Sequence, residues 1–475
     1  MELGTREFSE ADQRAFAFLS NDYNPMHMDR QAARRTQMGA PVVHGMNGAL
    51  WALELACAHE TTSFSGIKVN FSAPIYLGEQ VRTLLTKRSD EQLRLQARVG
   101  DALATTISVD LGNVADPQVH IASSPPREST WPQVPIAHTF NELATASGSF
   151  AIGGTAEAVT LYPKLCQRIG ALRAAGLAAL SRLVGMICPG LHSIFSGLSV
   201  RLVRSESEII SFTVVETDAR FNIVRMLVSG GGIEGEVTAV VRAAPTSQPS
   251  SRDIRRRVPA NLYRDADVLV VGGSRGLGEV TAKACAAGGA RVTITYVRGK
   301  DEALAVAREI EMEGGVCEAL HLDVQAGDFS KQLAALRRPI THLYYYATGP
   351  IAQRRTQFFS ADVLASFLQF YASGFASICQ TLSASGSNPL VAFYPSSIAV
   401  EETPRGWVEY AMAKAAGEVL CREMDMQLPG IRIVQQRLPR ILTDQTATSR
   451  GGQSADVLDV ILPLVDHVQR ALSQP

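Results

Sequence analysis

Three residues in the stretch NDYNPMHMD, residues 21–29, carry side chains suited to proton transfer. Asp22 offers a carboxylate, His27 an imidazole and Asn24 an amide, and Pro25 between them disfavours a regular helix. A carboxylate and an imidazole on one loop can share acid–base work, because one takes a proton while the other gives one. We therefore predict an extended loop that holds Asp22 and His27 as an acid–base pair.

A second stretch, PVVHGMNGAL at residues 41–50, completes the groups that such a reaction needs. Gly45 opens an apolar helix, and its backbone N–H can face a developing negative charge with the help of the helix dipole. Acid, base and oxyanion donor are the parts required to add or remove water beside a thioester carbonyl. His44, next to Gly45, is expected to make a structural hydrogen bond at the helix entry rather than to transfer a proton.

A third group of reactive side chains lies near the C-terminus. Ser397 ends the strand-like run VAFYPSS, and Tyr410 and Lys414 stand one helical turn apart in YAMAK. Reducing a ketone by hydride transfer builds charge on oxygen, and a phenol can protonate that oxygen if a nearby cation lowers its pKa. We predict that Ser397 orients the carbonyl, Tyr410 is the acid and Lys414 tunes it.

A glycine-rich turn, VGGSRGLG at residues 271–278, precedes this group and predicts a dinucleotide site. Gly272, Gly276 and Gly278 would let the backbone approach a pyrophosphate at a helix N-terminus. The turn also contains Ser274, and Asp323 ends a later strand where it could accept from an adenine amino group.

Positive charge around this turn indicates the cofactor. Arg275 lies in the turn, and Arg298 and Lys300 follow the second strand, where an acidic residue would instead bind a ribose diol. Positive charge at these places suits a 2′-phosphate. We expect NADPH, with NADH as the alternative cofactor, and a solvent-facing Arg298 or Lys300 as the alternative reading.

The elements that position these groups form a repeat followed by an alternating pattern. FSGIKVNFSAPI begins at Phe64 and FSGLSVRLVRSE at Phe195, each after an apolar helical segment with a Gly-Met pair and each before strand-like runs. One helix followed by antiparallel strands, occurring twice, indicates a duplicated α+β unit. After residue 261, apolar strands alternate with helices, which predicts a parallel sheet covered on both faces.

The first of these units resembles a known family. The segment FSEADQRAFAFLSNDYNPMHMDRQAARRTQMGAPVVHGM is similar to the MaoC-type (R)-specific enoyl-thioester hydratases, which have the hot-dog fold. The resemblance implies that Asp22 and His27 are the catalytic pair, that Asn24 orients them and that Gly45 binds the thioester oxygen. It also implies a double hot dog whose second half is degenerate, and residues 131–245 indeed lack the D-x-N-P-x-H motif.

The last part, about residues 263–447, resembles the short-chain dehydrogenase/reductase family through its glycine motif, Y-x-x-x-K and Ser397. The resemblance implies that Pro439 and Thr443 flank the nicotinamide, that Lys414 also contacts the cofactor, and that the protein is a homodimer or tetramer. Two positions depart from the family: its Asn-Ala-Gly strand end reads YATG here, and the asparagine of its catalytic tetrad aligns with Tyr371.

The predicted fold is therefore an α+β double hot dog followed by an α/β doubly wound parallel sheet. We expect a hot dog with the catalytic pair at 1–120, a degenerate hot dog at 131–245, a linker at 246–261 and a short-chain dehydrogenase/reductase domain at 262–475. The predicted function is a ketoreductase–dehydratase for acyl thioesters of coenzyme A or acyl carrier protein, in fatty-acid or polyketide-type biosynthesis. The alternatives are a catabolic hydratase with an NAD-linked dehydrogenase, and a non-catalytic acyl-carrier docking module.

Composition limits the other classes of function. The formal net charge is −1, so no nucleic-acid or anionic-membrane partner is indicated. Seven cysteines are scattered without a CxxC pair, which predicts reduced thiols in a cytoplasmic protein and no metal site. The charged N-terminal stretch argues against a signal peptide, and no apolar run is long enough to span a membrane.

Overall fold

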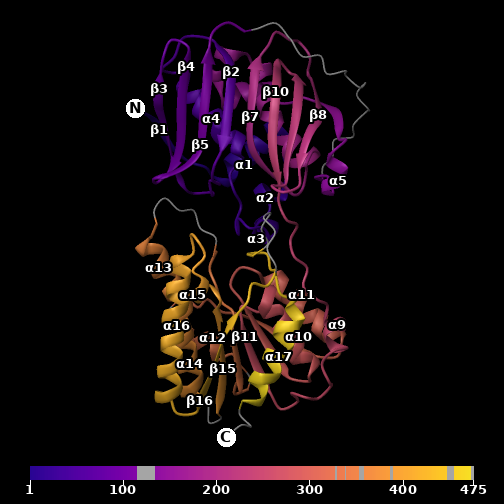
Figure 1. Cartoon of the computed structure of the whole chain (residues 1–475), viewed down its shortest axis with the longest axis vertical. Coiled ribbons are helices and arrows are strands. Elements are labelled where there is room, and N and C mark those ends of the chain that lie inside the picture. The colour runs from indigo at the N-terminus through magenta and orange to yellow at the C-terminus, as the bar shows by residue number, and fades with distance from the viewer. Residues whose placement is uncertain are drawn as a thin grey trace. The chain divides into compact units, whose positions relative to one another are not determined.

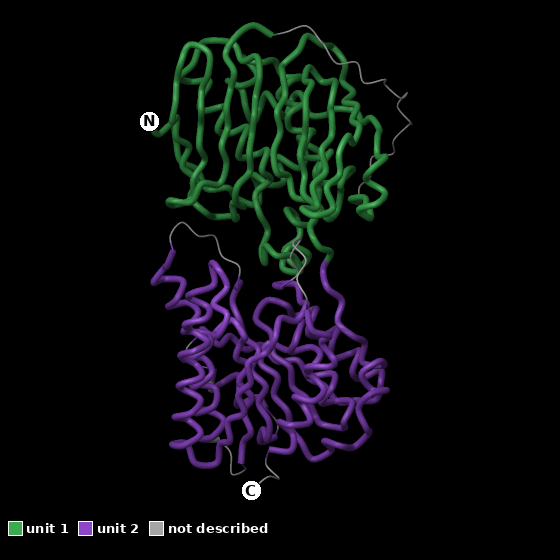
Figure 2. Tube along the Cα trace, viewed as in Figure 1, with its two compact units in different colours: residues 1–244, 448–451 green, residues 245–447, 452–475 purple. Residues whose placement is uncertain are grey.

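The computed structural model describes residues 1–114, 134–326, 329–336, 338–351, 358–385, 389–446 and 454–471. The chain divides into two compact units, with the change from the first to the second between Ala244 and Pro245 (Figure 2). Within these described ranges, no single helix is long and apolar enough to cross a bilayer, and only the pair Pro163–Ile169 with Ala171–Ile187, bent by 113°, passes when joined. All seven cysteines are free and buried.

The first unit contains one antiparallel sheet in the order β1-β3-β4-β5-β2-β7-β10-β9-β8-β6 (Figure 1). Its strands are β1 (Glu2–Glu7), β2 (Phe64–Phe71), β3 (Gln80–Arg88), β4 (Gln92–Val99), β5 (Ala102–Leu111), β6 (Ser147–Ala151), β7 (Ser193–Leu202), β8 (Ile209–Asp218), β9 (Ile223–Gly230) and β10 (Ile233–Val241). The two FSG strands, β2 and β7, pair with each other, with Ile67 opposite Val200 and Val69 opposite Leu198. The predicted duplication is confirmed, and the two repeats join along their equivalent strands.

Each repeat supplies one long buried helix. These are α4 (Gly45–Ala56) and α8 (Ala171–Arg182), and α4 lies behind the strands in Figure 1. Nearly every residue of α4 is buried, as expected for a helix that is apolar all round and wrapped by a sheet. The remaining helical elements are α1 (Glu10–Ser20), α2 (Pro25–Met28), α3 (Arg30–Arg34), α5 (Phe140–Leu143), α6 (Thr155–Leu161), α7 (Pro163–Ile169) and the π-helical turn η1 (Leu183–Ile187).

The Gly-Met pairs of the two repeats do not occupy equivalent places. Gly45 begins α4, whereas Gly185 lies in η1, after the end of α8. The shared Gly-Met pair therefore marks both repeats without marking equivalent positions in them. Gly185 packs instead against the Asp22 carboxyl.

The second unit is built on a parallel sheet in the order β13-β12-β11-β14-β15-β16. Its strands are β11 (Asp267–Val271), β12 (Arg291–Tyr296), β13 (Val316–His321), β14 (His342–Tyr345), β15 (Leu390–Ser397) and β16 (Ile431–Leu438). Its helical elements are α9 (Ser251–Arg255), α10 (Gly276–Ala287), α11 (Lys300–Met312), α12 (Ser330–Leu333), α13 (Ala361–Leu368), the π-helical turn η2 (Gln369–Gly374), α14 (Phe375–Ser385), α15 (Ala399–Glu402), α16 (Val408–Gln427) and α17 (Val457–Arg470).

Alternate residues of β11 face opposite layers of this unit. Val268 and Val270 pack in one hydrophobic core with α10, α11 and α17, whereas Leu269 and Val271 pack in another with α13, α14 and α16. Burial on both faces explains the continuous apolar run of the strand. The predicted parallel sheet with helices on both faces is confirmed.

Residues 246–261, predicted as a linker, are largely folded onto the second unit. Ile254 of α9 is completely buried in its core. The buried Lys283 donates to the Pro249 carbonyl at 3.2 Å, and the Ser251 N–H donates to Glu309 at 2.6 Å. The Pro/Ser-rich composition suggested an open connection, but these long-range contacts give the segment a fixed path.

Candidate functional sites

Asp22 and His27 lie at the junction of α1 and α2 in the first unit. Pro25 is the first residue of α2, where its missing N–H costs no helical hydrogen bond, and Asn24 caps this helix by accepting from the Met26 N–H at 3.0 Å. The expectation of an extended loop through Pro25 is therefore wrong. His27 projects from a short capped helix, which fixes its position more firmly than a loop would.

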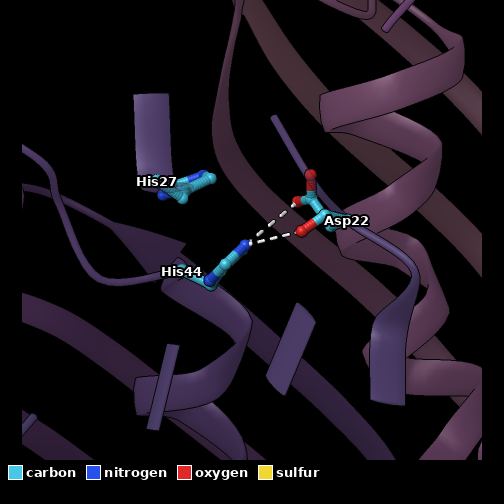
Figure 3. Close-up of side chains that lie close together, drawn as sticks. All are labelled: Asp22, His27 and His44. Atoms are coloured by element: carbon cyan, nitrogen blue, oxygen red, sulfur yellow. Dashed lines mark hydrogen bonds and ion pairs between the residues drawn. The ribbon is translucent and has the colours of Figure 1, made fainter. Parts of the chain in front are cut away.

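The structure brings a carboxylate and two imidazoles together. The ligating atoms of Asp22, His27 and His44 all lie within 4.8 Å of one another, and Figure 3 shows His27 and His44 side by side facing Asp22. The rings of His27 and His44 stack with their centroids 4.0 Å apart. The Nδ1 of His27 lies 2.8 Å from the Val42 carbonyl, which can only accept, so Nδ1 carries the proton. The Nε2 of His27 is thereby left to exchange a proton with a substrate.

His44 holds this arrangement in place. Its Nε2 lies 3.0 Å from the Asp22 carbonyl oxygen and 3.9 Å from the Asp22 carboxylate (Figure 3). Its Nδ1 lies 3.1 Å from the Gln13 amide oxygen. These contacts agree with the structural role predicted for His44.

The second repeat completes the site. The Ser181 hydroxyl, at the end of α8, donates to Oδ2 of Asp22 at 2.7 Å, and the Asn24 N–H donates to Oδ1 at 3.1 Å. The Asn24 amide donates to the Gly185 carbonyl at 2.7 Å. An ideal Cβ on Gly185 would lie 2.5 Å from Oδ1 of Asp22, so only glycine leaves room for the carboxylate. No local motif marks Ser181 or Gly185 as part of this site.

Burial sets the protonation of the pair. Desolvation raises the pKa of Asp22, which is 1% exposed, against the opposing effects of the His27 charge and the Ser181 hydrogen bond. Desolvation lowers the pKa of His27, although its side chain retains some exposure, and the Asp22 charge opposes this. Burial and then the charge of His27 lower the pKa of His44 well below its usual value. Burial therefore moves the pKa of Asp22 and that of His27 in the directions that favour their uncharged forms.

Gly45 has the place expected of an oxyanion donor. It is the first residue of α4, and the His44 carbonyl already accepts from the N–H groups of Asn47 and Gly48. The N–H groups at the helix start have no acceptor within the helix. An ideal Cβ on Gly45 would lie 2.9 Å from the Phe71 ring, so packing also favours glycine there.

The second unit places Ser397, Tyr410 and Lys414 together. Ser397 ends β15, and the other two lie on α16. Burial raises the pKa of the Tyr410 phenol, and a hydrogen bond with Ser397 opposes this. The Lys414 ammonium donates to the Pro395 carbonyl at 2.6 Å, and burial lowers its pKa to about 7.

The glycine turn between β11 and α10 has the form of a phosphate cradle. Gly272 and Gly276 have φ values of 80° and 60°, which favour glycine. An ideal Cβ on Gly278 would lie 2.3 Å from the Gly272 carbonyl, so the turn closes tightly only without side chains. The residues present therefore fit a dinucleotide pyrophosphate at the start of α10.

The other predicted cofactor residues follow the strands at the carboxyl edge of the sheet. The Thr443 side chain lies 3.7 Å from an ideal Cβ on Gly276, so the segment after β16 borders the cradle. Arg275 lies 3.8 Å from the Asp444 carboxylate, and Ser274 is 8% exposed. Each of the remaining predicted cofactor residues follows a strand of the sheet. Arg298 is exposed beyond β12, and Pro439 is exposed beyond β16. Asp323 lies beyond β13 and accepts from the Gln325 N–H at 2.9 Å.

Comparison with known proteins agrees with this division. Residues 3–109 match the family described as MaoC like domain, and residues 266–453 match short chain dehydrogenase. The (R)-specific enoyl-CoA hydratase of Aeromonas caviae is 31% identical over 112 residues, which are 22% of this chain and 84% of that protein. A solved short chain dehydrogenase from Burkholderia cenocepacia in complex with NADP is 23% identical and covers 44% of this chain and 91% of its own, with a TM-score of 0.39.

Two further relatives match the first unit over a smaller share of their own length. Peroxisomal multifunctional enzyme type 2 of Mus musculus is 29% identical over 113 residues, 22% of this chain and 15% of that protein. The mitochondrial 3-hydroxyacyl-[acyl-carrier-protein] dehydratase of Arabidopsis thaliana is 32% identical over 82 residues, 17% of this chain and 49% of that protein. Residues 266–453 of the second unit are similar to the short chain dehydrogenase family, and through its first unit this chain belongs to the MaoC-like hydratase/dehydratase family.

Proposed function

We propose that this protein reduces 3-ketoacyl thioesters with NADPH to (3R)-hydroxyacyl thioesters and dehydrates these to trans-2-enoyl thioesters, in fatty-acid or polyketide-type biosynthesis. The observation that carries the proposal is that one chain holds two sets of reactive groups whose reactions share an intermediate: Asp22 with His27, and Ser397 with Tyr410 and Lys414. The fusion raises the local concentration of that intermediate.

In the proposed dehydration, each member of the buried pair makes one proton transfer. The neutral Nε2 of His27 takes the C2 proton, because the Val42 carbonyl holds the other ring proton at Nδ1. The protonated Asp22 carboxyl gives its proton to the departing hydroxyl, which leaves as water. The Gly45 N–H stabilises negative charge on the thioester oxygen. Hydration runs through the same groups in reverse.

The reduction uses the second set of groups. Gly272, Gly276 and Gly278 would hold a nicotinamide cofactor, which would supply the hydride for the carbonyl carbon. Ser397 and Tyr410 hold the carbonyl oxygen, and Tyr410 donates its proton there as charge develops. The positive charge of Lys414 on the same helix makes the phenol a stronger acid.

The charges around the glycine turn favour NADPH. Arg275, at the N-terminus of α10, and the exposed Arg298 after β12 can both bind a 2′-phosphate. NADPH use favours reduction and therefore biosynthesis. The second candidate function is the catabolic direction, hydration of an enoyl-CoA followed by NAD-linked oxidation, which the similarity to an (R)-specific enoyl-CoA hydratase favours.

The test uses the full chain with acetoacetyl thioesters of coenzyme A and of acyl carrier protein. We expect NADPH oxidation and the appearance of a crotonyl product. Tyr410→Phe should abolish NADPH oxidation and leave crotonyl hydration intact, and Asp22→Asn should do the reverse. A clear preference for NAD with a 3-hydroxyacyl substrate would establish the catabolic direction instead, and the loss of neither activity in either variant would refute the assignment of both sites.

A further inference from the structure

Tyr371 lies against the reductase residues in an unusual local structure. It belongs to the π-helical turn η2, and its side chain is 1% exposed. Its ring meets the Tyr410 ring edge to face, with centroids 5.6 Å apart at 87°. π-Helical turns are rare and concentrate at functional sites, so this one calls for an explanation.

The ring of Tyr371 binds the Lys414 side chain. The Lys414 ammonium lies 4.0 Å from the centroid of the Tyr371 ring, closer than to the rings of Tyr394 at 5.1 Å and Tyr410 at 5.9 Å. This is the geometry of a cation–π contact, which is strongest where water is excluded, and Lys414 is only 6% exposed.

The other groups facing Lys414 do not replace this contact. The Pro395 carbonyl of β15 accepts one ammonium proton. Desolvation lowers the pKa of Lys414, and Cys421 and Glu418, on the same helix, oppose this without offsetting it. Arg437 donates hydrogen bonds to both carboxylate oxygens of Glu418, so the negative charge of Glu418 is largely compensated by Arg437 and not by Lys414.

Close packing fixes the ring in this position. An ideal Cβ on Gly417 would lie 3.0 Å from the Tyr371 carbonyl and would overlap the Tyr394 hydroxyl, so glycine lets α16 approach η2. The Tyr371 hydroxyl makes a short hydrogen bond with the Thr348 hydroxyl, beyond the end of β14. The Tyr371 ring is thus fixed by the packing of its main chain against α16 and by the hydrogen bond of its hydroxyl.

We propose that Tyr371 is a positioning residue of the reductase site, whose ring face holds the Lys414 ammonium in its charged form and directs it toward Tyr410. This inference rests on the proposed reductase function. A lysine ammonium has three N–H donors. The Pro395 carbonyl and the Tyr371 ring take two directions, which leaves the third for the cofactor and the reacting phenol. An aromatic ring can therefore serve where a polar side chain or a water would otherwise hold the lysine.

The test measures the pKa of Lys414 directly, through the carbon-13 NMR titration of the labelled chain, which has seven lysines. Lys414→Arg assigns the resonance. In Tyr371→Leu the cation loses the ring face, so its pKa should fall by about 1 to 1.5 pH units, and the alkaline limb of NADPH oxidation should move down equally. Tyr371→Phe keeps the ring and should leave both values within about 0.3 pH units of the wild type.

Two further variants separate the ring from other effects. Tyr371→Met fills similar space without a π face and should lower the pKa of Lys414 as Tyr371→Leu does. It replaces the leucine variant in the test if that variant does not fold. Thr348→Val removes the partner of the hydroxyl and should behave like Tyr371→Phe. An unchanged Lys414 titration in both Tyr371→Leu and Tyr371→Met, or an equal shift in Tyr371→Phe, would overturn the inference. Because the titration needs no substrate, a wild type without reductase activity would refute the proposed function separately.

Discussion

Gly185, from the second repeat, packs against the Asp22 carboxyl of the proposed hydratase site, and Gly185→Ala tests whether that site depends on this packing. The ideal Cβ at this position lies 2.5 Å from Oδ1 and 2.7 Å from Oδ2 of Asp22, whereas ordinary contact begins near 3.4 Å. The carboxyl must therefore move by roughly 0.9 Å. Gly185 does not have positive φ, so alanine suits its backbone and the clash is the main effect.

A displacement of this size should be costly for proton transfer. Misplacing a catalytic group by about 1 Å lowers the rate about a hundredfold, which equals about 2.7 kcal/mol in the barrier. We expect kcat for crotonyl-CoA hydration to fall by about that factor. The assay is the loss of enoyl-thioester absorbance, with NADPH oxidation by the second unit as a measure of enzyme concentration and thermal unfolding as the check that the first unit is folded.

Gly48→Ala is the matched control. Gly48 is also buried, in α4 of the same unit, but its ideal Cβ meets only Ile75 Cδ1 at 3.6 Å, an ordinary contact. Alanine in a helix interior should leave hydration unchanged and raise stability by up to about 1 kcal/mol. Wild-type hydration by Gly185→Ala, in a folded protein with normal NADPH oxidation, would refute the catalytic placement of Asp22.

Three further predictions concern both sites. Ser181→Ala removes the hydroxyl that donates to Asp22 at 2.7 Å and should slow hydration about tenfold with little change in KM, as steady-state kinetics would show. Asp22→Asn should abolish hydration and raise Tm at neutral pH by roughly 2–4 °C. Because the pKa of Asp22 is raised in the folded state, the wild type is stabilised by the protonated carboxyl at low pH and loses this stability as the pH rises through that pKa. Calorimetry should therefore show that the increase in Tm of Asp22→Asn over the wild type disappears toward acid pH. Arg275→Ala should weaken NADPH binding about tenfold and leave NADH binding unchanged in fluorescence titrations, since only NADPH carries the 2′-phosphate; an equal loss for both would contradict its role.

Ser181 and Asp22 lie too far apart in the sequence for any local pattern to relate them. Local spacing related Asp22 to His27 and Tyr410 to Lys414, because each pair lies within a few residues. Ser181 is 159 residues from Asp22, and no local rule connects them. The Pro25 error has a similar cause: proline breaks a helix interior but begins a helix well, and only the capping by Asn24 shows which applies.

The sequence by itself determined the duplicated α+β unit, the parallel sheet and the residue types of both sites, since strand and helix periods and short motifs are local properties. Only the tertiary structure decided that β2 pairs with β7, that Ser181 and Gly185 enclose the Asp22 carboxyl, and that the Tyr371 ring lies on Lys414. These contacts depend on how distant elements pack, and close packing in a buried site is a property of the whole fold.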